Sequence, residues 1–445
     1  MKVDVAPKLS NDKFTAWLIE HVADWKNALE LAKRVTSYLP WGKEKYKAPE
    51  GYAPEVWWSL LLLSRNLQEI DPQLKSASGE PFVLSFTVEV QALLHRIDLM
   101  CGVTTVSLQS PNQKSALGKL HRKHLQRSLL EEAISSSQME GASTTRAVAR
   151  KMLLEDRAPK DVSERMIFNN YKTIKMLEAW KDEPLSESLL FKIHRSLTFD
   201  TLEEEKQGRY RVAADGPITV SKGFETVFVP PPVETLPERM KCLIAFANQS
   251  HEQGNVFLHP VLKAILLHTL LAYEHPFCDG NGRTARALFS WFLLREGYWQ
   301  TSYVSLSRAL AKNRKAYDAA YLAMETCHFD TTYNVLVNLK AFKDALESLH
   351  AHLNEQIEDA TRMHASFGDL FNARQFDLLD HSLRHEGYLY TVAEHARWHQ
   401  TTLNTARADL LDLKKKGYLK LSYKGRLQEF RSTGLFAQQA SDKKL

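Results

Sequence analysis

Cysteine is scarce in this chain of 445 residues, and the cysteines that are present do not cluster. No two of them form a CxxC pair, so the sequence indicates neither a zinc knuckle nor a disulfide framework. The four are Cys101, Cys242, Cys278 and Cys327. Because nothing calls for an oxidising compartment, we expect a cytoplasmic protein.

Long apolar runs are also missing. The longest, residues 57–63 and 264–273, fall short of the roughly 20 residues that a membrane-spanning helix needs. The N-terminal residues lack the apolar core of a signal peptide. We therefore expect a soluble protein with no membrane partner.

Glycine and proline are few. The 18 glycines and 16 prolines lie below the roughly 12% of average usage, which favours long helices over a strand-rich fold. Charged residues make up 25% and hydrophobic residues 44%, as in an ordinary globular protein, and we find no repeats. Disordered and collagen-like chains are excluded, and a mostly α fold is predicted.

The length predicts about three domains. Helical periodicity predicts an N-terminal helical region over residues 1–115 and a central helical domain over 116–350, in which 307–324 is expected to form one helix. A linker helix is expected over 351–370. The period changes to two at 217–230, which predicts a single β-hairpin with strands at 218–220 and 226–229.

The last segment, residues 371–445, has a different pattern. Three helices are predicted, followed by two strands that form a hairpin. This order of elements is typical of a winged helix-turn-helix. The helices are expected at 374–383, 392–398 and 402–416, and the strands at 419–423 and 427–431.

The residues that point to chemistry lie in one turn, 275–286, between two predicted helices. Gly280, Asn281 and Gly282 leave backbone N–H groups open at the start of the second helix, a cradle for phosphate. Arg283 and Arg286 share one helix face and can bind outer phosphate oxygens. Asp279 is a ligand of the kind that Mg²⁺ takes, and His275 is a general base that is partly neutral at cellular pH.

The order of these residues resembles the signature HPFx[D/E]GNGRxxR of the Fic (filamentation induced by cAMP) domain, and every fixed position is present. The resemblance extends over roughly residues 116–350. Asn313 and Arg314, with Tyr317, resemble a later element of the family near the nucleotide base. The resemblance implies a Fic-type helical core, in which the predicted hairpin is a flap that docks the target protein.

The resemblance implies transfer of a nucleoside monophosphate, usually AMP from ATP, to a Ser, Thr or Tyr hydroxyl of a protein. His275 would accept the hydroxyl proton and Asp279 would hold Mg²⁺, while Gly280, Asn281 and Gly282 would form the anion hole. Arg283 and Arg286 would hold the outer phosphates. Ile218, Thr219 and Val220 of the flap would pair with the backbone of the target. UTP, GTP and CDP-choline remain alternative donors.

A second element lies upstream, at the end of the helix predicted over 117–139. Ser136 and Glu140 match the inhibitory pattern [S/T]xxxE[G/N] of the family, with Gly141 ending the helix. If Glu140 pairs with Arg286, that arginine is lost to the γ-phosphate. We therefore expect an autoinhibited protein adenylyltransferase.

Two other functions stay open. Glu140 near the cradle could orient a water for removal of AMP instead of its transfer. The chain could also be a DNA-binding regulator, because residues 371–445 hold 13 lysines and arginines against 8 aspartates and glutamates and so carry the whole net charge of +5. The candidate DNA contacts are Thr402, Asn404, Arg407 and Lys424.

The expected partners are therefore ATP and a protein substrate, which can be the chain itself. The C-terminal domain is expected to contact DNA or another protein, and a homodimer is left open.

Overall fold

The computed structural model describes residues 4–108, 116–222, 225–253, 256–367, 370–399, 401–425 and 427–442. The chain divides into two compact units. The first combines Met1–Thr105 with Lys123–Glu347, and the second combines Val106–Arg122 with Ser348–Leu445. The expected boundary at residue 115 lies outside the described residues.

Short helices form the N-terminal part of the first unit. They run α1 (Asp12–Glu20), α2 (Trp25–Lys33), α3 (Trp41–Glu44), α4 (Pro54–Arg65) and α5 (Val88–Leu108), with a small antiparallel pair β1 (Gln68–Glu69) and β2 (Val83–Leu84) between the last two. Asn11 caps α1 with its side chain, and Pro54 stands at the first position of α4, where no N–H is needed. Trp57 and Trp58 are buried, as packing residues.

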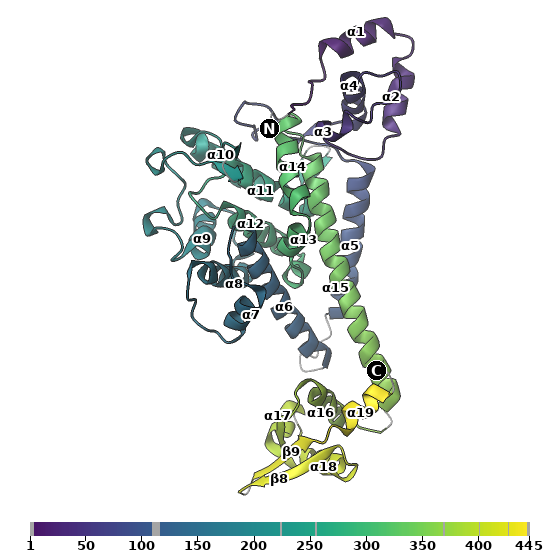
Figure 1. The fold of residues 1–445 in the computed structure, drawn as a ribbon, viewed down its shortest axis with the longest axis vertical. Coiled ribbons are helices and arrows are strands. Elements are labelled where there is room, and N and C mark those ends of the chain that lie inside the picture. The colour runs from purple at the N-terminus through teal and green to yellow at the C-terminus, as the bar shows by residue number, and fades with distance from the viewer. Residues whose placement is uncertain are drawn as a thin grey trace. The chain divides into compact units, whose positions relative to one another are not determined.

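The core of the first unit is a set of longer helices. They are α6 (Ala116–Met139), α7 (Arg146–Leu154), α8 (Val162–Trp180), α9 (Glu187–Thr198), α10 (Leu236–Asn248), α11 (Pro260–Glu274), α12 (Asn281–Arg295), α13 (Leu306–Lys312), α14 (Arg314–Thr326) and α15 (Thr332–Phe367). In Figure 1, α11 and α12 lie between α10 and α8. Almost every residue of these two helices is buried, which is the pattern of helices covered on all sides. The loop that joins them is therefore held by a rigid core.

One prediction about this core is wrong in detail. Residues 307–324 form two helices instead of one, because the backbone leaves the helical region at Asn313 (φ −127°, ψ 48°). The residues expected to form a linker helix, 351–370, are helical as far as Phe367, where they continue α15. A short pair β5 (Glu252–Gln253) and β6 (Val256–Phe257) was not expected.

The predicted hairpin is present, but its first strand begins later than expected. Strand β3 covers Val220–Lys222 and pairs with β4 (Glu225–Phe228), with Val220 opposite Phe228. Continuing that register would place Ile218 opposite Pro230, which has no N–H to donate. Ile218 and Thr219 therefore precede the strand instead of forming it.

The second unit ends in the three helices and the hairpin that the sequence predicts. They are α16 (Ala373–Arg384), α17 (Val392–His399), α18 (Leu403–Lys415), β8 (Leu419–Lys424) and β9 (Leu427–Ser432). Two further elements were not predicted: β7 (Leu389–Thr391), which extends the sheet to the order β7-β9-β8, and α19 (Leu435–Asp442). Its core includes Leu378, Leu379, Tyr390, Leu410, Leu413 and Phe430.

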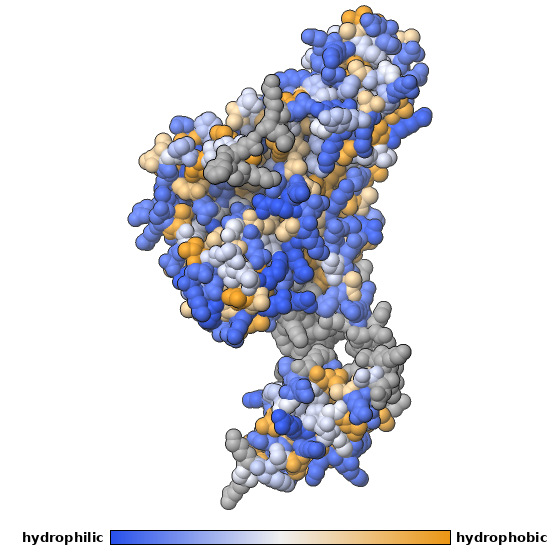
Figure 2. Space-filling view, in the orientation of Figure 1, coloured by the Kyte–Doolittle hydropathy of each residue, from blue (hydrophilic) through white to orange (hydrophobic). Residues whose placement is uncertain are grey.

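The described helices do not include a membrane-spanning segment. In the part of the chain that the structure describes, no helix combines the length and the apolar character needed to cross a bilayer. Figure 2 shows a mostly hydrophilic face on which the hydrophobic residues are scattered.

Candidate active site

The turn at residues 275–286 is shaped by two residues in the left-handed region. His275 ends α11 with φ 47° and ψ 55°, and Gly280 precedes α12 with φ 78°. A Cβ on Gly280 would also lie 2.8 Å from Cγ2 of Thr198, so only glycine fits. The Asn281 side chain closes the loop, since its Nδ2 donates to the Phe277 carbonyl and its Oδ1 accepts from the Phe277 N–H.

Three residues that the sequence did not single out as site residues support this loop. Gly208 donates its N–H to Nδ1 of His194 at 2.9 Å, so the other nitrogen of His194, Nε2, donates to the Asp279 carbonyl at 2.9 Å. Burial lowers the pKa of His194 to about 4, which keeps this ring neutral. Arg211 donates its backbone N–H to the Pro276 carbonyl and its Nε to the His275 carbonyl.

The only sequence signal for these supporting residues is positional. Gly208 and Arg211 stand just before the predicted hairpin, and His194 lies on the buried face of a helix. The ring of His194 stacks on Phe277 with a centroid distance of 3.8 Å. A buried histidine in a helix is ordinarily interpreted as a core residue. His194 is a core residue that also fixes the loop through the Asp279 carbonyl.

His275 is held in the form that a general base requires. Its Nδ1 lies 3.3 Å from the Ala272 carbonyl, an acceptor, so Nδ1 carries the hydrogen and Nε2 keeps its lone pair. Burial lowers the pKa of His275 below its usual value, against the opposing effects of the Ala272 bond and the Glu140 charge. The imidazole is therefore neutral at pH 7.

The start of α12 offers open donors. The first N–H groups of any helix have no acceptor within the helix, and here they belong to Asn281, Gly282 and Arg283. The Asn281 side chain is used inside the loop, so this residue can serve an anion only through its backbone. The positive end of the helix dipole adds to the attraction for an anion.

The two arginines of the turn are buried and already engaged. Arg283 donates to the Leu197 carbonyl at 3.1 Å and to Asp279 Oδ2 at 3.0 Å. Arg286 donates through Nε to Ser136 Oγ and through Nη2 to the Ser136 carbonyl, both at 2.9 Å. Charges this deep are costly unless paired, and both guanidinium groups are paired.

The carboxylate of Glu140 lies between Arg286 and the start of α12. Its Oε1 accepts from Arg286 Nη2 at 2.9 Å, so the structure contains the pair that the sequence predicts. A Cβ added to Gly282 would lie 2.2 Å from that same oxygen, so the carboxylate rests against the start of α12. Burial alone would raise the pKa of Glu140, but Arg286, Arg283 and Arg314 outweigh it and hold this pKa below its usual value.

Asp279 fits the part of a magnesium ligand. Its side chain is 57% exposed at the rim of the loop, and only Oδ2 accepts from Arg283. Within the described residues no group of three or more metal-type side chains converges. Mg²⁺ ordinarily takes one or two carboxylates together with water and substrate phosphates, so a single exposed carboxylate beside a phosphate cradle agrees with its chemistry.

Tyr317 is buried and takes part in a short chain of hydrogen bonds. Its hydroxyl is hydrogen-bonded to His268 Nε2 at 3.0 Å and to the Tyr321 hydroxyl at 3.2 Å. Burial lowers the pKa of His268 to about 3, so this ring is neutral. The charges of Arg286 and Glu140 both affect the pKa of Tyr317, so this residue lies near that pair, although its hydroxyl is used within the protein.

The remaining predicted residues lie elsewhere. Ile218 is half-buried and Thr219 is exposed in the segment before β3, and Val220, the first residue of β3, is half-buried. In the second unit Thr402 caps α18, with its hydroxyl accepting from the Thr405 N–H, and Asn404 and Arg407 are exposed. Lys424 is the last residue of β8.

Comparison with known proteins identifies the domain that carries this turn. Residues 184–293 match the model of the Fic/DOC family. The chain is 33% identical over 155 residues to a protein from Nematostella vectensis named protein adenylyltransferase Fic, which covers 35% of this chain and 32% of that protein. It is 30% identical over 114 residues to protein adenylyltransferase fic-1 of Caenorhabditis elegans, which covers 25% of this chain and 22% of that protein.

The chain therefore spans about a third or less of the length of these curated relatives. A crystal structure of a Fic family protein from Desulfovibrio desulfuricans matches the fold with a TM-score of 0.55 at 18% identity, covering 79% of this chain and 97% of that one. At this identity the match shows the fold alone. Residues 184–293, with the turn at 275–286, thus form a domain of the Fic/DOC family.

Proposed function

We propose that this chain is a protein adenylyltransferase, which transfers AMP from ATP to a Ser, Thr or Tyr hydroxyl of a protein. The observation that carries the proposal is the placement of His275. Its Nε2 keeps a lone pair, and the open N–H groups of α12 begin only six residues later. A neutral base beside an anion cradle is the arrangement that phosphoryl-type transfer requires.

In this mechanism the protein mainly positions the two substrates and stabilises the charge of the phosphates, and it forms no covalent bond with either substrate. Nε2 of His275 takes the proton of the target hydroxyl as the oxygen attacks the α-phosphorus. The bond from that phosphorus to the bridging oxygen of the β-phosphate breaks, and pyrophosphate leaves. The N–H groups of Gly282 and Arg283 bind the negative charge. Asp279 would hold Mg²⁺, which supplies neutralisation of the triphosphate charge.

Glu140 makes the resting enzyme inactive. Its carboxylate takes the Arg286 donor that the γ-phosphate needs and lies against Gly282, where phosphate oxygens would sit. An ATP molecule that binds around this carboxylate is held wrongly for in-line attack. We do not propose the alternative reaction, removal of AMP by a water that Glu140 would orient, because the same carboxylate is committed to Arg286.

Intact-mass spectrometry tests both the reaction and the donor. Glu140→Gly incubated with Mg²⁺ and ATP, UTP, GTP or CDP-choline should gain the mass of AMP with ATP. Glu140→Gly combined with His275→Ala should gain nothing, since the base is gone. A mass gain with another donor would replace ATP in the proposal, and a gain that persists without His275 would overturn the mechanism.

A second proposal concerns α18 of the second unit. Asn404 and Arg407 are exposed on this helix, which lies in the segment that carries the whole net charge of +5. Exposed polar and cationic side chains on one helix suit a contact with DNA. We propose DNA as a ligand of this unit, which retardation of duplex DNA by the full chain would test.

A further inference from the structure

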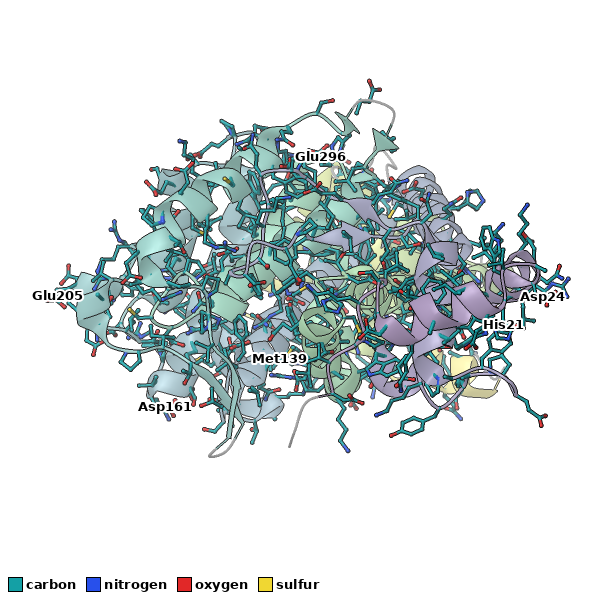
Figure 3. All side chains as sticks on the ribbon, turned by 90° about the horizontal axis from the view of Figure 1, so that it is seen from above. His21, Asp24, Met139, Asp161, Glu205 and Glu296 are labelled. Carbon is teal, nitrogen blue, oxygen red and sulfur yellow. The ribbon has the colours of Figure 1, made fainter. Side chains whose placement is uncertain are left out.

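The end of α6 is held from a different helix. Arg314, the first residue of α14, donates from Nη1 to the carbonyl of Met139 at 2.9 Å. Met139 is the last residue of α6, stands directly before Glu140 and is labelled in Figure 3. Arg314 is itself oriented by Asp318, whose Oδ1 accepts from its Nε at 2.7 Å.

The local turn explains why this carbonyl needs a partner. The carbonyls of Ser137 and Gln138 are taken by backbone N–H groups of the turn that follows, which passes through Gly141 at φ 93°. The carbonyl of Met139 receives the Arg314 guanidinium instead. A cation at a helix C-terminus is also favoured by the helix dipole.

The charge of Arg314 also acts on the neighbouring carboxylate of Glu140. Together with Arg286 and Arg283 it lowers the pKa of Glu140, which keeps the carboxylate ionised. Arg314 thus affects the inhibitory residue in two ways, by fixing the carbonyl one residue before it and by its electrostatic field. Its side chain is 45% exposed, so removing it leaves no buried cavity.

We propose that Arg314 is a positioning residue of the inhibitory helix, which fixes the end of α6 so that Glu140 stays on Arg286. This inference rests on the proposed autoinhibition. It differs from the role that the sequence resemblance implies, in which Arg314 belongs to an element near the nucleotide base. The two roles predict opposite effects on AMP transfer.

Hydrogen exchange without any nucleotide tests the placement directly. In Arg314→Ala the amides of residues 135–141 should exchange several-fold faster than in the wild type, because the last turn of α6 has lost its cap. Arg314→Lys should exchange at a rate between the two. Lys315→Ala, which removes an exposed cation from the next position of α14, should match the wild type. Unchanged exchange in Arg314→Ala overturns the proposal, whatever the activity.

Labelling with ATP then separates the two roles. In the otherwise wild-type chain Arg314→Ala should raise the initial rate roughly five-fold, the size expected for a helix-end cation. In the Glu140→Gly background it should change nothing, since no inhibitor remains to be positioned. A raised KM for ATP in that background would make Arg314 a nucleotide-binding residue and overturn the proposal. If Glu140→Gly alone labels no faster than the wild type, the autoinhibition fails, and hydrogen exchange still decides whether Arg314 holds α6.

Discussion

At the scale of single residues, the site depends on side chains whose hydrogen bonds are used up inside the protein. Asn281 and His194 each bond backbone groups of the loop, and neither is left to contact a ligand. What they leave exposed is backbone N–H and the Nε2 lone pair of His275. The reactive groups are therefore few, and the surrounding residues fix their directions.

The pH dependence of the reaction follows from His275. Burial lowers the pKa of this ring below 6.5, so the base is already neutral at pH 7 and the rate should be flat above it. As pH falls through the lowered pKa, the ring takes a proton and the rate should fall. Initial rates of AMP transfer by Glu140→Gly between pH 5 and 9 measure this. A rate that still rises between pH 7 and 8 would contradict a lowered pKa for the catalytic base.

A loop variant tests the support that Asn281 gives. Asn281→Ala removes both bonds to the Phe277 backbone and leaves two buried groups without partners, at a cost of about 1–3 kcal/mol. In the Glu140→Gly background, AMP transfer should fall by at least tenfold, because the N–H groups of α12 lose their fixed direction. Thr269→Ala is a control that also loses a buried hydrogen bond, to Asn334 in α15, outside the loop. Equal activity loss in both variants would show that general instability is the cause.

At the scale of elements, α6, the helix that ends directly before Glu140, is attached to the core by the buried carboxylate of Glu132. Glu132 of α6 accepts from the Ser305 hydroxyl at 2.8 Å, from the Ser307 N–H at 2.9 Å and from the Ser307 hydroxyl. It thereby joins α6 to the start of α13. The next helix, α14, carries both Arg314 and Tyr317. Glu132 therefore links α6 to the segment of chain that leads directly into α14.

Removing that attachment should lower stability. Glu132→Ala leaves a buried N–H and two hydroxyls without an acceptor, which costs about 1–3 kcal/mol and lowers the melting temperature by a few degrees. Glu155→Ala is the matched control, because Glu155 is exposed and its ion pair with Lys151 spans 3.9 Å. Differential scanning calorimetry measures both, and equal melting temperatures for the two variants would argue against the attachment.

Most elements and the catalytic turn could be predicted from sequence, and the misses share a physical cause. The turn at 275–286 has a composition that local rules interpret directly, and the pair Glu140–Arg286 follows from its spacing pattern and the resemblance. The start of β3 at Val220 depends on the register with the opposite strand, and the break at Asn313 depends on a change in backbone angles that the helical pattern does not reveal. His194 and Arg211 were missed because their role is a contact with residues 64 to 85 positions away.

At the scale of the whole molecule, charge is divided between parts of the sequence. Residues 371–445 hold 13 basic against 8 acidic residues, so the preceding 370 residues are neutral overall. Within these 370 residues, Arg283 and Arg286 stand in one turn, the proposed phosphate site. The C-terminal segment instead carries an excess of basic residues, which favours contact with a polyanion.

This distribution predicts a salt-sensitive contact with DNA. The full chain should retard duplex DNA at low salt and release it as salt rises, and Arg407→Ala should weaken binding several-fold. Lys315→Ala, which removes the same charge from the first unit, should leave binding unchanged. Electrophoretic mobility at two salt concentrations measures this. No retardation at low salt, or equal loss in the two variants, would contradict a specific role for α18.

The most direct test of the account is the comparison of wild type with Glu140→Gly in the presence of labelled ATP and Mg²⁺. If the carboxylate of Glu140 holds Arg286 and covers the start of α12, its removal should raise the initial rate of AMP incorporation at least tenfold. The same variant with His275→Ala should return to background. Equal labelling of wild type and Glu140→Gly would contradict the central claim that this contact keeps the enzyme inactive.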